Sequence, residues 1–314
     1  MEYRRIGDLE VSLVGLGCNN FGMTIDAEAT KLVVDAALDA GITYFDTAEM
    51  YGNGQSEEFL GRALGAKRSQ AIVATKWGHD ASLKEGERGG DPALVRRSLE
   101  ASLKRLGTDY VDHYQLHRPD SKTPQDETLG VLEELRQEGK IREIGCSEFS
   151  AEQLDDATSA AQYKGIPNYA SVQNHYSLFT RAPETTGVLE ACARDQMAFV
   201  PYFPLESGLL TGKYRLGEDL PENSRLQRWG KRAKAFIDDD KLATVSRLDA
   251  WAGAKGHSLL ELAMSWLASN PQIASVIAGA TKPDQVAVNA TSAGWVLSHD
   301  ERAQVDRILA GETV

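Results

Sequence analysis

The chain has 314 residues, and its 42% hydrophobic content is enough to form one large domain or two ordinary ones with a substantial core. It carries 34 Lys and Arg residues against 46 Asp and Glu residues, a net charge of −12, and the basic residues are spread along the chain. This charge balance argues against nucleic acid or an anionic membrane surface as a partner.

In chain order, short apolar runs alternate with longer amphipathic segments. The apolar runs predict strands at residues 14–18, 42–47, 71–76, 111–117, 141–146, 169–175, 198–203 and 274–279. The amphipathic segments predict helices at residues 27–40, 56–64, 92–106, 125–139, 151–163, 183–194, 241–254 and 283–292. Such a regular alternation of strand and helix is typical of an α/β fold of the (β/α)8 TIM-barrel type.

Three segments lie outside this alternation. Residues 3–12 contain two short β-prone runs around Gly7-Asp8 and predict a hairpin that plugs the N-terminal mouth of the barrel. Residues 205–240, rich in Gly and charge, are expected to form a long lid-like loop at the catalytic face. A further helix is expected at about residues 298–310. Residues 1–314 are therefore expected to form a single barrel domain.

An open doubly wound sheet is the structural alternative to a barrel. It would bind a dinucleotide at a Gly-rich turn that leads from a strand directly into a helix. The nearest candidate is Gly15-Leu-Gly-Cys-Asn-Asn20, which lacks the third glycine and does not open directly into a helix. The sequence therefore favours the barrel.

The chain shows no signal for secretion or membrane insertion. The stretch Met1-Glu-Tyr-Arg-Arg-Ile-Gly7 has basic residues but no apolar run behind them, and no run long enough to span a bilayer follows. The three cysteines, Cys18, Cys146 and Cys192, are odd in number and lack a CxxC spacing, which suggests neither a disulfide framework nor a zinc site. We expect reduced thiols in a cytoplasmic protein.

Four polar residues follow or end successive predicted strands. Asp46 ends the second strand, Tyr51 lies on the loop behind it, Lys76 ends the third and His117 ends the fourth. Because the C-terminal strand ends of a barrel meet at one mouth, these side chains are expected to lie together. Lys76 can lower the pKa of the Tyr51 phenol, Asp46 can hold the charge of Lys76, and His117 can donate a hydrogen bond to a carbonyl oxygen.

Each of the four also has an ordinary interpretation. Alone, Asp46 could cap a turn, Tyr51 could pack, Lys76 could be solvated, and His117 could be structural. Their coincidence at successive strand ends favours catalysis. The other histidines considered are expected in packing, surface or loop positions: His113 in packing, and His79, His257 and His299 on the surface or in loops.

The motifs around these residues resemble those of the aldo-keto reductase superfamily, over nearly the whole chain. They are Phe45-Asp-Thr-Ala-Glu-Met-Tyr-Gly52, Ser56-Glu57, Lys76, Leu116-His-Arg-Pro-Asp120, Ile144-Gly-Cys-Ser147, Val172-Gln-Asn174, Gly208-Leu-Leu-Thr-Gly-Lys213 and Val276-Ile-Ala-Gly-Ala-Thr281. The resemblance implies a barrel that binds NADP(H) without a Rossmann domain and transfers hydride reversibly between the nicotinamide and a carbonyl. It implies that Tyr51 is the general acid, that Lys76 and Asp46 tune it, and that His117 positions the substrate.

The resemblance also implies a set of cofactor contacts. Ser147 and Gln173 would hold the nicotinamide carboxamide, and Tyr202 would stack on the ring. The remaining expected contacts are Pro204, Leu205, Gly208, Leu210 and Lys213 on the pyrophosphate side, Gly279, Thr281, Gln285 and Asn289 at the adenosine end, and Lys282 for a 2′-phosphate.

The chain departs from the family pattern at three positions of the cofactor site. Glu148 stands where many members have Asn, and a carboxylate there can accept a hydrogen bond from the carboxamide amine and would favour NADP+ over NADPH. Phe203 stands where a serine is common and suggests a local packing change. Gln285 occupies the expected second position of a 2′-phosphate clamp, so NADP(H) is preferred as cofactor over NAD(H) without a strong clamp.

Substrate identity is not encoded in these motifs. The expected pocket residues are Met23, Met50, Trp77, His117 and Trp229, together with the loops at 79–90 and 205–240. Met50 and Trp77 beside the catalytic residues would make the wall apolar and aromatic, or they could be ordinary packing. We expect an aldehyde or ketone of hydrophobic or aromatic character as substrate, a flexible 79–90 loop, and a monomer by default.

Two other function classes compete with a reductase. The superfamily includes the β subunits of voltage-gated potassium channels, which bind NADP(H) as partners and possible redox sensors. A barrel hydrolase or lyase could use Lys76 or Tyr51 without nicotinamide, although the apparent carboxamide and ring-stacking residues would then have no purpose.

Overall fold

The computed structural model describes residues 1–222, 224–230, 233 and 237–312, without the side chains of Arg225 and Trp229. Its centre is a parallel sheet with the strand order β10-β3-β4-β5-β6-β7-β8-β9. The strands are β3 (Val14–Gly17), β4 (Tyr44–Asp46), β5 (Ile72–Trp77), β6 (Val111–Leu116), β7 (Ile141–Ser147), β8 (Ser171–Gln173), β9 (Ala198–Phe199) and β10 (Val276–Gly279).

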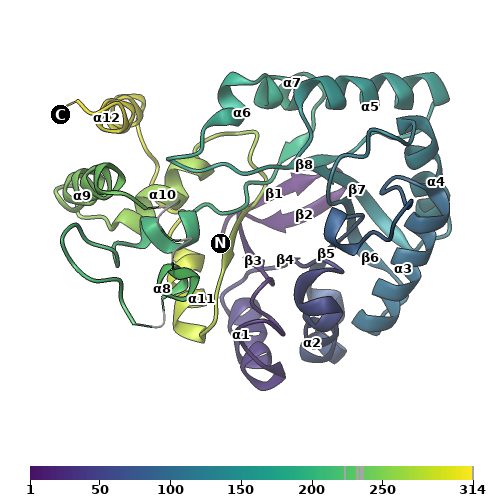
Figure 1. Cartoon of the computed structure of the whole chain (residues 1–314), viewed down its shortest axis with the longest axis horizontal. Coiled ribbons are helices and arrows are strands. Elements are labelled where there is room, and N and C mark those ends of the chain that lie inside the picture. Colours follow the sequence, from purple (N-terminus) through teal and green to yellow (C-terminus); the bar gives the residue numbers. More distant parts are fainter. Residues whose placement is uncertain (223, 231–232, 234–236, 313–314) are drawn as a thin grey trace.

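The two ends of this sheet meet and close it. The Phe199 amide donates to the Gln272 carbonyl at 2.8 Å, and the Ala274 amide donates to the Phe199 carbonyl at 3.0 Å. Helices surround the closed sheet (Figure 1). The predicted (β/α)8 barrel is confirmed, and each predicted strand overlaps an observed one.

The helices begin and end largely where the sequence predicts. They are α1 (Ala27–Asp39), α2 (Gln55–Leu64), α3 (Pro92–Leu106), α4 (Gln125–Gln137), α5 (Ala151–Lys164), α6 (Ala182–Thr185), α7 (Val188–Arg194), α8 (Arg225–Trp229), α9 (Asp239–Gly253), α10 (Leu259–Ala268), α11 (Pro283–Thr291) and α12 (His299–Leu309). Side-chain caps fix several starts: the Asp26 carboxylate accepts from the Ala29 amide, and Asp91 accepts from the Ala93 amide ahead of Pro92.

Two parts of the helix prediction differ from the structure. The helix predicted at 183–194 is divided into α6 and α7, because Gly187 adopts a left-handed φ of 79° between them. The helix α10 was not predicted, although Ser258 and Glu261 form a capping box at its start. Nearly all of its residues are buried, so it lacks an amphipathic pattern. The helix α10 packs beside β10. The helix α9 packs against α10 on the outside, and α12 packs against α9 (Figure 1).

The predicted hairpin is present as β1 (Tyr3–Ile6) and β2 (Leu9–Ser12), paired antiparallel. Ile6, Leu9 and Val11 are buried in a cluster with residues at the starts of the barrel strands, among them Tyr44. The hairpin therefore closes the N-terminal end of the barrel. Since that end is closed, the C-terminal strand ends are left to form a site.

The segment 205–240 leaves the barrel after β9, on the C-terminal side of the strands. Its described part contains a short 3-10 helix, Glu206–Thr211, and α8. Nowhere in the described ranges does a helix reach the length and apolar character needed to cross a membrane.

Candidate active site

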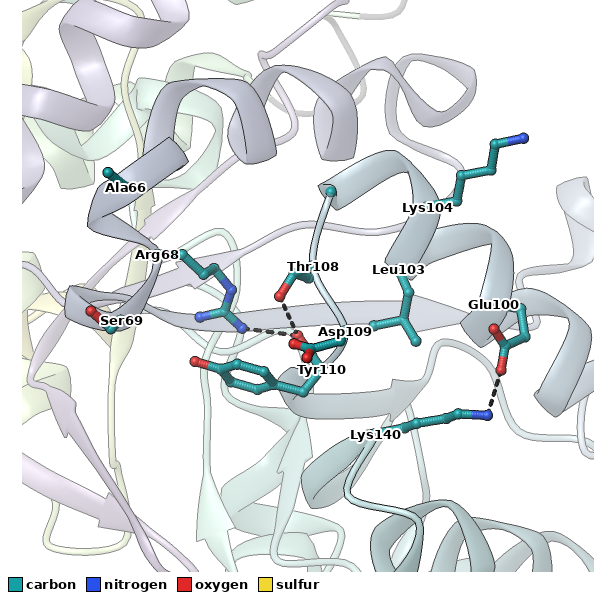
Figure 2. Close-up of a pocket in the computed structure, with 11 residues that line it drawn as sticks. Ala66, Arg68, Ser69, Glu100, Leu103, Lys104, Thr108, Asp109, Tyr110 and Lys140 are labelled. Carbon is teal, nitrogen blue, oxygen red and sulfur yellow. Dashed lines mark hydrogen bonds and ion pairs between the residues drawn. The ribbon is translucent and has the colours of Figure 1, made fainter.

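Two hollows stand out in the described part of the chain, at opposite ends of the strands. One, of about 890 Å³, lies before the starts of β5, β6 and β7 and is lined by mixed charges (Figure 2). In it the Arg68 guanidinium donates to the Tyr110 carbonyl at 3.1 Å, and Lys140 pairs with Glu100 at 2.7 Å. None of the predicted site residues lines this groove.

The second hollow, of about 700 Å³, opens at the C-terminal strand ends. Asp46, Tyr51 and His117 line it, and Lys76 lies fully buried directly beneath. The structure thus brings the four predicted catalytic residues together.

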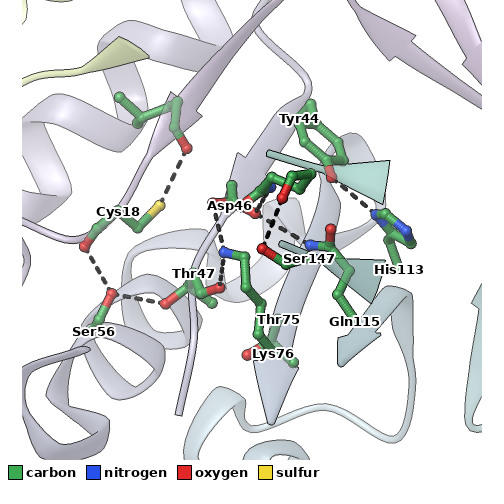
Figure 3. A network of polar contacts seen from close by, with 12 residues as sticks. Cys18, Tyr44, Asp46, Thr47, Ser56, Thr75, Lys76, His113, Gln115 and Ser147 are labelled. Carbon is green, nitrogen blue, oxygen red and sulfur yellow. Dashed lines mark hydrogen bonds and ion pairs between the residues drawn. The ribbon is translucent and has the colours of Figure 1, made fainter. Parts of the chain in front are cut away.

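A buried ion pair forms the floor of this cavity (Figure 3). Lys76 Nζ donates to Asp46 Oδ2 at 2.7 Å and to the Thr47 carbonyl at 2.9 Å. The other oxygen, Asp46 Oδ1, accepts from Gln115 Nε2 at 3.3 Å and from Gln173 Nε2 at 3.1 Å. One carboxylate therefore joins residues of β4, β5, β6 and β8.

Tyr51 stands over this pair, at the start of the short 3-10 helix Tyr51–Gly54. Lys76 Nζ lies 5.2 Å from the centre of its ring. Burial raises the pKa of Tyr51, and the hydrogen bond and positive charge of Lys76 only partly oppose the rise. The sequence-based expectation of a lowered pKa therefore differs from the structure, because desolvation of the phenolate outweighs Lys76.

Lys76 itself keeps its charge. Burial works to lower its pKa, but the carboxylate of Asp46 and the oxygen of Tyr51 more than compensate, so that the pKa is raised above 10.5. A protonated lysine and a protonated tyrosine therefore lie together at neutral pH.

His117 faces Tyr51 edge-on, with ring centres 5.9 Å apart. Burial, with the nearby charge of Lys76 and contributions from His79 and Arg118, lowers the pKa of His117 to about 2. The imidazole is therefore neutral, and its Nδ1 is a buried atom without a hydrogen-bond partner among the described residues. His79, which we expected on the surface or in a loop, lines the cavity and lies 4.8 Å from the His117 ring.

His113, expected to pack, is buried with both nitrogens engaged. Nδ1 lies 2.9 Å from the Tyr44 hydroxyl and Nε2 lies 3.1 Å from the Ser171 hydroxyl. Burial lowers its pKa to about 3, so it is neutral.

Most residues expected to hold a cofactor line the cavity: Ser147, Glu148, Gln173, Tyr202, Pro204, Leu205, Gly208, Lys213, Gly279, Thr281, Gln285 and Asn289. Leu210, which is fully buried, and Lys282, the residue before α11, do not line it.

Only some of the expected substrate-pocket residues line the cavity. Met50 lines the cavity with His117, whereas Met23 is exposed outside it. Trp77 is fully buried below the rim; its Nε1 donates to the Gly89 carbonyl at 2.9 Å and its ring stacks on Tyr114. Trp77 therefore anchors the 79–90 loop instead of forming the cavity wall.

The fifth expected pocket residue, Trp229, has a side chain outside the described residues.

The carboxamide end of the predicted cofactor site contains an ion pair that the sequence did not reveal. Glu148 adopts a left-handed φ of 62°, and its Oε2 lies 3.1 Å from Arg118 Nη1. Its Oε1 is buried and has no partner in the described structure. Ser147 Oγ donates to the Gln173 carbonyl at 2.8 Å. A hydrogen bond to the Glu148 carboxylate also contributes to raising the pKa of Tyr202. A buried carboxylate oxygen, Oε1, therefore lies without a hydrogen bond of its own where a carboxamide amine is expected.

Tyr202 and the loop behind it are held by one buried carboxylate. Glu206 Oε1 accepts from His175 Nε2 at 3.0 Å, from Thr180 Oγ1 at 2.8 Å and from the Ser177 hydroxyl. The His175 ring stacks on Tyr202, with centres 5.3 Å apart. Left-handed φ values recur along this loop, at Phe203, Glu206, Ser207 and Gly208. Such a backbone persists only when its surroundings hold it.

At the other end of the cavity, Thr281 and the first turn of α11 form the wall. The Thr281 amide donates to Gln285 Oε1 at 2.8 Å. Gln285 thus occupies part of the helix N-terminus where an arginine could clamp a phosphate.

Comparisons with known proteins agree with this geometry. The model of the aldo/keto reductase family matches residues 13–310. A probable voltage-gated potassium channel subunit beta of Oryza sativa subsp. japonica is 37% identical over 303 residues, covering 92% of this chain and 90% of that protein. The aldo-keto reductase yakc of Schizosaccharomyces pombe, whose name specifies NADP(+), is 34% identical over 275 residues, or 84% of this chain and 78% of that protein.

A solved structure is similar over almost the full length. The glycerol dehydrogenase AKR11B4 from Gluconobacter oxydans gives a TM-score of 0.82 at 33% identity, covering 99% of this chain and 95% of that chain. The fold and the cluster at its strand ends define a barrel oxidoreductase. The chain belongs to the aldo-keto reductase family, which is NADP-linked.

Proposed function

We propose that this protein is an NADP(H)-dependent reductase that converts an aldehyde or ketone to an alcohol, reversibly. The observation that carries the proposal is the convergence of Asp46, Lys76, Tyr51 and His117 at one cavity. The rest of that cavity is lined by residues expected to hold a dinucleotide.

The residues present fit NADP(H). Ser147, Gln173 and Glu148 would hold the nicotinamide carboxamide, with the unpartnered Glu148 Oε1 as an acceptor for its amine. Lys213 and Thr281 would contact the phosphates. The bound cofactor supplies a hydride to the carbonyl carbon. A preference for NADP(H) over NAD(H) is part of the proposal and is favoured by the named specificity of one relative.

Tyr51 supplies the proton in this scheme. Its raised pKa keeps the phenol protonated at neutral pH, so it is ready to donate to a carbonyl oxygen on which negative charge develops. Lys76 stabilises the phenolate that forms, and Asp46 stabilises Lys76. The neutral His117 can donate a second hydrogen bond to the same oxygen and so orient the carbonyl.

The test is NADPH consumption with a panel of small aldehydes, followed by near-ultraviolet absorbance, in the native protein and in Tyr51→Phe. A fluorescence titration of NADPH into both proteins separates binding from chemistry. Loss of turnover with binding retained supports Tyr51 as proton donor. Equal turnover in both proteins would contradict it, and a native protein that does not bind NADPH would contradict the cofactor assignment.

The second candidate function is that of an NADP(H)-binding regulatory or redox-sensing subunit. It is favoured by the 37% identity to a protein named as a probable potassium channel β subunit. Tight NADPH binding without turnover of any aldehyde in the panel would support this candidate. A cytoplasmic location and a monomeric state remain predictions.

A further inference from the structure

The cavity contains a cation, Arg118, whose role neither the motif analysis nor the proposed reaction explains. Arg118 follows the catalytic His117 at the end of β6 and lines the cavity. Its positive charge contributes to lowering the pKa values of His117 and His79, and it opposes the rise in the pKa of Tyr202. The guanidinium therefore lies at the reacting end of the cavity, among the groups that would surround a carbonyl substrate.

The charge of Arg118 is only partly compensated. Lys76 balances Asp46 beneath the floor, and both histidines facing the guanidinium favour the neutral form. Glu148 is the ion-pair partner of Arg118, with Nη1 and Oε2 3.1 Å apart. A guanidinium has five N–H donors, and within the described residues the other donors of Arg118 have no protein acceptor. Its side chain is 37% exposed and lines the cavity.

The backbone that carries Arg118 is held in place. Asp120 Oδ2 accepts from the Gly90 amide at 2.9 Å and from Thr123 Oγ1 at 2.6 Å, and Asp120 Oδ1 accepts from the Lys122 amide at 2.8 Å. Proline follows Arg118 directly in the sequence. The backbone turn that carries Arg118 is therefore held in place, so little backbone entropy is lost when the guanidinium binds a ligand.

We propose that Arg118 is a specificity residue that binds a carboxylate on the substrate, so that the preferred substrates are aldehydes or ketones that carry a carboxylate. This rests on the proposed reductase function. The free edge of the planar guanidinium matches a carboxylate, and such charge-assisted pairs are stronger than neutral hydrogen bonds. Glu148 competes for the same guanidinium and moderates the preference.

The test uses matched substrates at saturating NADPH: 4-carboxybenzaldehyde against 4-methylbenzaldehyde, and succinic semialdehyde against butanal. The quantity scored is the ratio of kcat/KM for the charged member to that for the neutral member, in which effects on cofactor binding cancel. We expect a ratio above one in the native protein. In Arg118→Met the ratio falls about 10- to 100-fold, through KM of the charged member. In Glu148→Gln it rises, because Arg118 loses its competitor.

The matched control is Arg307→Met, which removes an exposed arginine on α12 and leaves the ratio unchanged. A ratio that Arg118→Met does not lower would overturn the proposal. If the native protein reduces no aldehyde, the proposed function fails, and calorimetry still decides the role of Arg118. Binding of 4-(hydroxymethyl)benzoate, measured with and without NADP+, must then weaken at least about tenfold in Arg118→Met. Equal binding of 4-(hydroxymethyl)benzoate by the native protein and Arg118→Met would refute the carboxylate-binding role of Arg118.

Discussion

The buried pair of Lys76 and Asp46 makes a prediction about stability that is independent of any substrate. The change is Asp46→Asn, which keeps the size of the side chain but removes the negative charge. Lys76 is fully buried, and in the variant its ammonium would lose the carboxylate 2.7 Å away. The new amide also replaces one acceptor oxygen by an N–H group, which faces either Lys76 or the donors of Gln115 and Gln173.

Removing one partner of a buried ion pair costs about 3–5 kcal/mol, because the other charge is left uncompensated. With a urea m value of about 3 kcal/mol/M, the midpoint of unfolding falls by about 1–1.7 M. The matched control is Asp35→Asn on α1, whose carboxylate pairs with Lys31 and Lys67 on the surface. For Asp35→Asn we expect the free energy of unfolding to fall by about 1 kcal/mol or less.

The same variant has a distinctive pH dependence. In the native protein the pKa of Lys76 is raised above 10.5, so its contribution to stability is present below that value and is lost as the pH rises through the folded pKa. In Asp46→Asn, burial would lower the pKa of Lys76, and the folded state would bind fewer protons than the unfolded state. The free energy of unfolding of Asp46→Asn should therefore rise between about pH 7 and 9. In the native protein Lys76 causes no change in stability over this range.

The assay is urea unfolding followed by tryptophan fluorescence at several pH values in that range. A loss for Asp46→Asn no larger than that for Asp35→Asn would refute the assignment of a costly buried pair. If the free energy of unfolding of Asp46→Asn instead falls as the pH rises, Lys76 is not left as a buried charge without a partner in the variant.

Three further predictions concern ligands and rate. Glu148→Asn should raise the ratio of the dissociation constants of NADP+ and NADPH at least about threefold, since a carboxylate favours the positively charged ring; equal ratios in fluorescence titrations would contradict this. Glu206→Gln should weaken NADPH binding about tenfold, because His175 loses a charged acceptor and Tyr202 loses its support; an unchanged dissociation constant would argue against that role. Because the pKa of His117 is about 2, the rate of reduction should show no step from this residue between about pH 5 and 8; a step that disappears in His117→Gln would show that the imidazole titrates there.

The fold could be predicted well because its signals are local. Each strand of the barrel is a short apolar run, and Asp26 and Asp91 cap helix starts. The helix α10 was missed because it is buried on nearly all sides, which removes the periodicity on which the prediction relies. The break at Gly187 needs a backbone conformation that composition alone does not specify.

The positions of site residues could be predicted only where those residues lie at strand ends. Asp46, Lys76 and His117 were placed together because the topology requires their strand ends to meet. For Trp77 the sequence leaves open a place in the pocket wall or in packing, and the structure shows packing. Alternation along β5 offers a clue: if Lys76 points inward, its neighbour points outward, where Trp77 stacks on Tyr114.

Interactions between distant segments could not be predicted. The contact of Arg118 with Glu148 joins loops after β6 and β7 and depends on a left-handed residue. The pKa of Tyr51 depends on the balance between burial and the charge of Lys76, which requires the packed structure. Sequence patterns name the ionisable groups, whereas packing decides their protonation.

The most direct test of the central claim is to follow the transferred hydrogen itself. The native protein would be given an aldehyde that it consumes, together with NADPH carrying deuterium on the transferring face of the nicotinamide, and the alcohol would be analysed by mass spectrometry. The account predicts deuterium on the carbinol carbon, with formation of the labelled alcohol lost in Tyr51→Phe. An alcohol without deuterium from NADPH labelled on either face, or NADPH binding with no alcohol formed from any aldehyde, would contradict it.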